Sequence, residues 1–189
     1  MPRDFKQAVE FSHELLAEHI SSGAKVVDAT AGNGYDTEFL AKLVGEQGLV
    51  WAFDVQKEAI ERTGERLQKA DLAQRVELIK DGHQNLAEYI DTDLAGLIFN
   101  LGYLPGGDKE LITEAETTLE AVAAGVDLLA EGGLLVVVAY LGHAGGMEEY
   151  QALLDYLQSL DSRSYNVLNY RFLNQQSEPP QVLAVKKRS

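Results

Sequence analysis

The sequence has 189 residues, of which 46% are hydrophobic and 24% charged, as in a globular chain that can bury a core. Its net charge of −14 argues against a generic nucleic-acid binder but does not exclude a local basic patch. The absence of cysteine excludes disulfides and thiolate metal sites. No apolar run is long enough to span a membrane, and the N-terminus lacks a signal-peptide core. We therefore expect one cytoplasmic domain over residues 1–189, without a membrane partner.

The hydrophobic pattern predicts strands that alternate with helices five times, followed by a closing hairpin. We expect helices over 4–20, from the glycine turn to near 45, and over 56–70, 86–90, 117–130 and 147–160. Strands are expected over 24–28, 49–54, 75–80, 95–100, 134–140, 164–173 and 181–186. The helix at 117 is predicted from a Thr117-x-x-Glu120 capping box. This order predicts an α/β fold: a Rossmann-like, seven-stranded, mostly parallel sheet with one antiparallel strand and helices on both faces.

The stretch Val26 to Thr37 has the pattern of a strand, a glycine turn and a helix, which together form a nucleotide-type cofactor site. Gly32 and Gly34 allow the backbone to pass close to a ligand. Acidic residues end this strand and the next two, and the carboxyl ends of parallel strands meet at one edge of a sheet. The candidate cofactor-binding residues are Asp28, Thr30, Gly32, Asn33, Gly34, Asp36, Asp54, Gln56, Asp81, Gly82, His83 and Asn100.

Two cofactor classes compete for this pattern. A dinucleotide would place its pyrophosphate over the helix N-terminus, where Asp28 and Asp36 would repel it. S-adenosylmethionine (SAM) has no phosphate and carries a sulfonium and an ammonium, which acidic side chains suit. The sequence therefore favours SAM and leaves an NAD-dependent oxidoreductase as the alternative. The acids have a second interpretation as helix caps, with the greatest weight at Asp81.

The segments Asp28 to Gly34, Phe53 to Gln56, Asn100 to Lys109 and Gly142 to Gly146 carry a resemblance to a known family. The first resembles the glycine motif of class I SAM-dependent methyltransferases, although Thr30 departs from it. Together they are similar to the bacterial rRNA methylase family, of the tRNA 5-(aminomethyl)(2-thio)uridine methyltransferase type. The resemblance implies N-methylation of the 5-aminomethyl group of the wobble uridine, with the tRNA anticodon region as partner. An rRNA or a small-molecule amine remains an alternative substrate, and a homodimer remains open.

The string Asn100-Leu101-Gly102-Tyr103 resembles the Asn-Pro-Pro-Tyr loop of amino-methyltransferases, in which the Asn oxygen accepts amine hydrogens and the aromatic ring stacks on the base. The candidate catalytic residues are Asn100, Tyr103 and His143, and the candidate substrate-binding residues are Tyr103, Pro105, Gly106, Gly107, Lys109 and His143. The three catalytic candidates have plainer interpretations: Asn100 as a turn former, Tyr103 as a packed aromatic and His143 as a polar loop residue. His13 and His19 are expected to be structural, and the four histidines are too scattered for a metal site.

Overall fold

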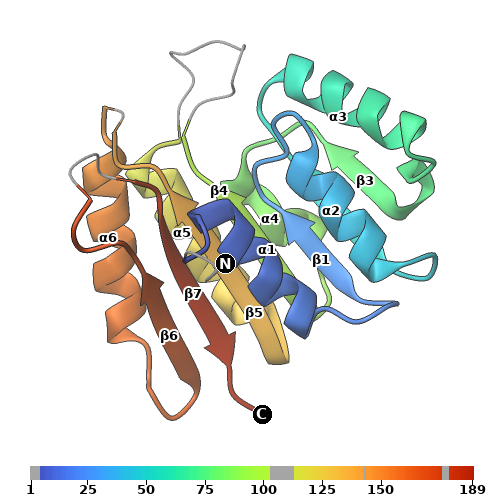
Figure 1. Ribbon diagram of the computed structural model, residues 1–189. Coiled ribbons are helices and arrows are strands. Elements are labelled where there is room, and N and C mark those ends of the chain that lie inside the picture. The colour runs from blue at the N-terminus through green and yellow to red at the C-terminus, as the bar shows by residue number, and fades with distance from the viewer. Residues whose placement is uncertain (1–4, 103–112, 143, 176–178) are drawn as a thin grey trace.

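Seven strands form one sheet in the order β3-β2-β1-β4-β5-β7-β6 (Figure 1). The computed structural model describes residues 5–102, 113–142, 144–175 and 179–189. The strands are β1 (Lys25–Asp28), β2 (Leu49–Phe53), β3 (Val76–Ile79), β4 (Leu94–Asn100), β5 (Leu129–Ala139), β6 (Tyr165–Tyr170) and β7 (Gln181–Lys187). The helices are α1 (Ala8–His19), α2 (Tyr35–Val44), α3 (Lys57–Lys69), α4 (Leu86–Tyr89), α5 (Ala115–Leu128) and α6 (Gly146–Ser159), with 3-10 turns at Ala73–Arg75 and His83–Asn85.

Strands β1 to β5 pair in parallel, and β7 runs antiparallel to both of its neighbours, β5 and β6. The predicted sheet, with a single antiparallel strand, is confirmed. The chain moves outward from β1 to β3 and then returns to place β4 on the other side of β1. This reversal creates a switch point between β1 and β4, and ligands bind at the carboxyl ends of the strands beside such a point.

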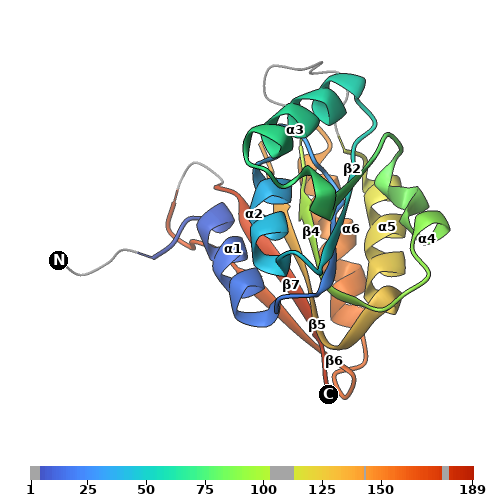
Figure 2. The same cartoon turned by 90° about the vertical axis from the view of Figure 1, so that its right-hand side faces the viewer.

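Helices cover both faces of the sheet (Figure 2). Successive strand residues point to opposite faces, so Val26 belongs to the core under α1, α2 and α3, and Val27 to the core under α4, α5 and α6. Both side chains are fully buried. Within the described part of the chain, no helix is long and apolar enough to cross a membrane.

Several predicted boundaries in the second half of the chain are wrong, among them the end of β6, which is Tyr170 instead of Leu173. The capping box at Thr117 does not start a helix, because α5 begins at Ala115, after the extended backbone of Glu114. The Thr117 hydroxyl donates to the Glu114 carbonyl at 3.1 Å from inside the first turn. Strand β5 begins at Leu129 instead of Leu134, because Leu129 pairs with Leu94 before a register shift that spans the Gly132-Gly133 pair.

Candidate functional site

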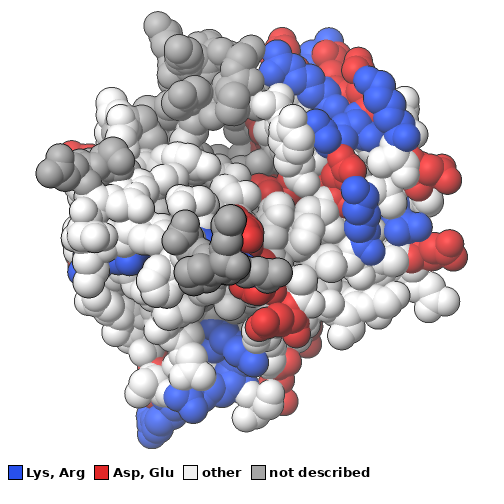
Figure 3. All heavy atoms as spheres, in the orientation of Figure 1, with Lys and Arg blue, Asp and Glu red and all other residues white. Residues whose placement is uncertain are grey.

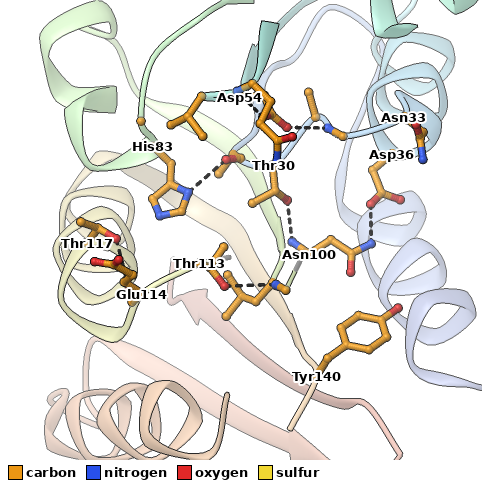
Figure 4. Close-up of a pocket in the computed structure, with 18 of the residues that line it drawn as sticks. Thr30, Asn33, Asp36, Asp54, His83, Asn100, Thr113, Glu114, Thr117 and Tyr140 are labelled. Carbon is orange, nitrogen blue, oxygen red and sulfur yellow. Dashed lines mark hydrogen bonds between the residues drawn. The ribbon is translucent and has the colours of Figure 1, made fainter. Parts of the chain in front are cut away.

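A cavity of about 1090 Å³ lies at the carboxyl ends of β1 to β5. Residues that follow each of these strands line it, and α1 and the segment leading into α5 complete the wall (Figure 4). Four acidic residues line it (Asp36, Asp54, Asp81 and Glu114), and no Lys or Arg is among the described lining residues. The cavity is therefore suited to a ligand that carries positive charge and no phosphate.

The glycine turn folds around Asp28, which is fully buried. Its carboxylate accepts the backbone N–H of Thr30 at 3.1 Å and the hydroxyl of Thr37 at 2.5 Å. Burial, followed by the charge of Asp36, raises the pKa of Asp28 to about 7. Asp28 does not line the cavity, so the structure changes its expected role from ligand contact to support of the turn. The strand end directs the side chain beneath the loop, which sequence spacing could not show.

The two glycines of the turn have different roles. Gly32 lines the cavity with φ near +55°, and its N–H donates to Asp54 Oδ2 at 2.9 Å. Gly34 lies outside the cavity lining, with φ near +78°. A Cβ at Gly34 would meet the Thr63 hydroxyl at 2.9 Å. Gly34 thus permits close packing of the turn on α3 instead of access to a ligand.

The ends of β2 and β3 place their predicted residues along the cavity. Asp54 accepts N–H groups from Gly32 and Gln56, one at each carboxylate oxygen, and burial raises its pKa. Asp81 Oδ1 accepts from the backbone of Gly82 and Oδ2 from the Tyr89 hydroxyl, and these bonds, with that to Tyr89 foremost, lower its pKa. Both acids are thus ordered by protein donors.

His83 lies on the inner wall of the cavity, with its ring edge-on to Phe99 at 5.8 Å. Burial lowers the pKa of His83, which favours the neutral form of the ring. Nδ1 lies 3.2 Å from the Ala29 carbonyl and must carry the proton, because a carbonyl only accepts. The unprotonated Nε2 lies 3.5 Å from the Thr118 hydroxyl.

Asn100 is the predicted catalytic residue that the structure describes. Its backbone N–H donates to the Thr30 hydroxyl at 2.7 Å, and its side-chain Nδ2 donates to Asp36 Oδ2 at 3.0 Å (Figure 4). Thr30, the departure from the family motif, thus joins the glycine turn to β4. The other predicted catalytic and substrate-binding residues (Tyr103, Pro105, Gly106, Gly107, Lys109 and His143) lie outside the described residues.

Three residues in or beside the site were not predicted from the sequence. His13 reaches the cavity from α1 and contacts Asp36, and Tyr140 lines the wall after β5. Glu149, on α6 and 2% exposed, accepts hydroxyl groups of Thr113 at 3.0 Å and Thr118 at 2.6 Å. None of the three belongs to one of the segments that carry the family resemblance, so only their tertiary placement reveals them.

The sheet order and the acidic cavity at the switch point are those of a class I methyltransferase. A family model described as "Putative rRNA methylase" matches residues 50–186, and one described as protein-L-isoaspartate(D-aspartate) O-methyltransferase matches residues 6–93. The chain belongs to this rRNA methylase family of class I SAM-dependent methyltransferases. Its cofactor is SAM, which the acidic lining fits, and the alternative of an NAD-dependent oxidoreductase is not supported.

Similar proteins cover almost the whole chain. A chloroplastic protein of Arabidopsis thaliana named tRNA (mnm(5)s(2)U34)-methyltransferase is 36% identical over 96% of this chain and 70% of its own length. A crystal structure of a putative rRNA-methylase from Clostridium thermocellum has a TM-score of 0.96 at 43% identity, over 98% of this chain and 100% of that one. A putative methyltransferase from Streptococcus mutans, solved with S-adenosylhomocysteine (SAH), has a TM-score of 0.89 at 37% identity, over 97% and 99%.

Proposed function

We propose that this methyltransferase acts on the 5-aminomethyl group of the wobble uridine, often 2-thiolated, of tRNA. The name of the Arabidopsis relative supports this substrate. The observation that carries the proposal is the side chain of Asn100, whose nitrogen is bound by Asp36. Its amide oxygen is thereby left to accept a hydrogen from an amine in the cavity.

Methyl transfer to nitrogen requires an amine with a free lone pair. An alkylammonium has no lone pair, so the amine must first lose a proton. The Asn100 oxygen then accepts one amine hydrogen and orients the lone pair toward the methyl group. SAM would supply an electrophilic methyl on a sulfonium: the new N–C bond would form as the C–S bond breaks, which would leave SAH and the methylated ammonium. The rate gain comes chiefly from proximity and orientation.

A local basic surface on α3 supports an RNA substrate despite the net charge of −14. Arg62, Arg66 and Lys69 line a shallow depression on this helix. Glu38 and Glu65 line it too and pair with Arg66 and Lys69, so that positive side chains predominate there but are mixed with negative ones (Figure 3). Arg62 and Arg66 also hydrogen-bond Asn33, which belongs to the cavity lining. The Arg66 guanidinium lies 3.8 Å above the centre of the exposed Tyr35 ring. Cations and an aromatic face beside a cavity mouth are the groups that contact phosphates and unstacked bases.

The proposal is tested by methyl transfer from tritiated SAM into tRNA from a strain that lacks this protein. Mass spectrometry of the nucleosides should show 5-aminomethyl-uridines gaining one methyl group each. Purified rRNA and free aminomethyl nucleosides are run in parallel. Incorporation into either of these, with none into tRNA, would reject the tRNA substrate.

We further propose the anticodon region as the binding site, a homodimer as the active species and a cytoplasmic location. Footprinting tests the first of these, light scattering the second and cell fractionation the third.

A further inference from the structure

A chain of hydrogen bonds connects the N-terminal helix to Asn100. His13 Nε2, on α1, lies 2.6 Å from Asp36 Oδ1, in the first turn of α2. Asp36 Oδ2 accepts the Asn100 amide nitrogen at 3.0 Å. Both oxygens of the Asp36 carboxylate are therefore engaged, one by each neighbour. All three residues line the cavity.

The chemistry of this chain fixes the orientation of the Asn100 amide. A carboxylate only accepts hydrogen bonds, so His13 presents Nε2–H to it and Asn100 presents its NH₂ group. The Asn100 oxygen must then lie on the other side, away from Asp36, as Figure 4 shows. An unconstrained amide could turn its oxygen and nitrogen around and offer the amine a donor.

Each end of the chain is itself held in place. The His13 ring stacks on Phe39 with a centroid distance of 3.9 Å and an angle of 4° between the planes. Asp36 is 6% exposed, so water competes little for its oxygens. At the other end, Thr30 holds the Asn100 backbone. These contacts hold the Asn100 amide from both ends, and supporting contacts of this kind keep the polar groups of a site in their productive geometry.

We propose that His13 and Asp36 are positioning residues, which act through Asn100 by holding its amide oxygen toward the substrate amine. The inference rests on the proposed function, because it assumes that Asn100 accepts an amine hydrogen. It makes α1 part of the catalytic apparatus. It also assigns Asp36 a specific role, besides its contribution to the negative charge of the cavity.

Substitutions at His13 separate positioning from proton transfer. Gln places an amide N–H near the position of the imidazole Nε2 and cannot take up a proton, whereas Ala removes the donor. We expect His13→Ala to lower kcat on tRNA by about a hundredfold, with a smaller change in KM. His13→Gln should recover most of this loss. His19→Ala is the matched control on the same helix: His19 bonds the Leu15 carbonyl, does not line the cavity and should leave kcat unchanged.

A readout without substrate keeps this inference separate from the proposed function. In a ¹⁵N NMR spectrum, the side-chain amide of Asn100, assigned by its loss in Asn100→Ala, should shift in His13→Ala and Asp36→Ala and stay near its wild-type position in His13→Gln. Unchanged Asn100 signals in the two Ala variants, with folding verified by melting, would overturn the inference. So would a His13→Gln enzyme as slow as His13→Ala, because His13 would then act as a proton acceptor. If wild-type protein methylates no tRNA, the proposed function fails while the NMR result still stands.

Discussion

The hydroxyl of Thr30 accepts the backbone N–H of Asn100 at 2.7 Å, across 70 residues of sequence. One partner belongs to the glycine turn that lines the cavity, and the other ends β4. The bond therefore joins the turn that is proposed to bind the cofactor to the residue that is proposed to hold the methyl acceptor.

Replacing Thr30 by Val keeps the shape of the side chain but leaves the Asn100 N–H without its acceptor. We expect the free energy of unfolding to fall by about 1–3 kcal/mol, the cost of an unsatisfied polar group. Urea denaturation measures the loss, and methyl transfer should fall with it. Thr30→Ser restores the hydroxyl and should recover stability; equal stabilities for Val and Thr would show that the bond contributes nothing.

Asn100→Ala should separate turnover from cofactor binding. Without the amide, nothing at this position orients the amine, and we expect kcat to drop by about a hundredfold or more. The affinity for SAH, measured by calorimetry, should stay at the wild-type value. A parallel loss of both would instead identify Asn100 as a cofactor ligand.

Asp28 should make stability depend on pH. Its pKa is about 7 in the folded protein against 3.8 for an ordinary Asp, so the folded state holds this proton more tightly than the unfolded chain. The stabilising contribution is complete below about pH 4 and is lost as the pH rises to about 7. Asp28→Asn removes the titration. The stability of the variant relative to wild type should therefore rise across this window, by about 4 kcal/mol at most. Urea denaturation at several pH values tests this, and parallel curves for the two proteins would contradict it.

Glu149 links α6 to the start of α5 and to the residues just before it. Its carboxylate accepts from Thr113 and Thr118, and the Thr113 hydroxyl in turn accepts the Gly102 N–H at 3.1 Å. Glu149→Gln replaces one acceptor by a donor and should lower the unfolding free energy by about 1–3 kcal/mol. The exposed neighbour Glu148 is the matched control, and Glu148→Gln should stay within about 0.5 kcal/mol of wild type. Equal effects at the two positions would show that the buried carboxylate is not special.

The α3 surface should govern RNA affinity if RNA is the substrate. A double Arg62→Ala, Lys69→Ala variant should weaken tRNA binding and reduce the slope of log affinity against log salt by about 1 to 2. An Arg163→Ala, Arg188→Ala variant removes the same charge beside β6 and β7, far from the cavity lining. Filter binding across a salt series compares the two, and an equal loss in both would point to net charge instead of a specific surface.

The sequence predicted what depends on local patterns. Alternating apolar segments defined the sheet and its single antiparallel strand, and polar residues at strand ends placed Asp54, Asp81 and Asn100 at one edge. What depends on packing could not be predicted. His13 was expected to be structural, because nothing local shows that α1 lies beside α2. The burial of Asp28 likewise follows from how the turn closes over β1, not from the residue type.

Strand β7 has a consequence for synthesis on the ribosome. When Tyr170 has just been added, the edge strand β6 lacks its neighbour in the sheet, because β7 is made later and lies between β6 and β5. Val182, Leu183 and Val185 of β7 are fully buried between the two helix layers. Until β7 emerges, the nascent chain therefore exposes the edge of β5 and the apolar side chains that β7 later covers. We expect that interval to be when the protein most needs a chaperone.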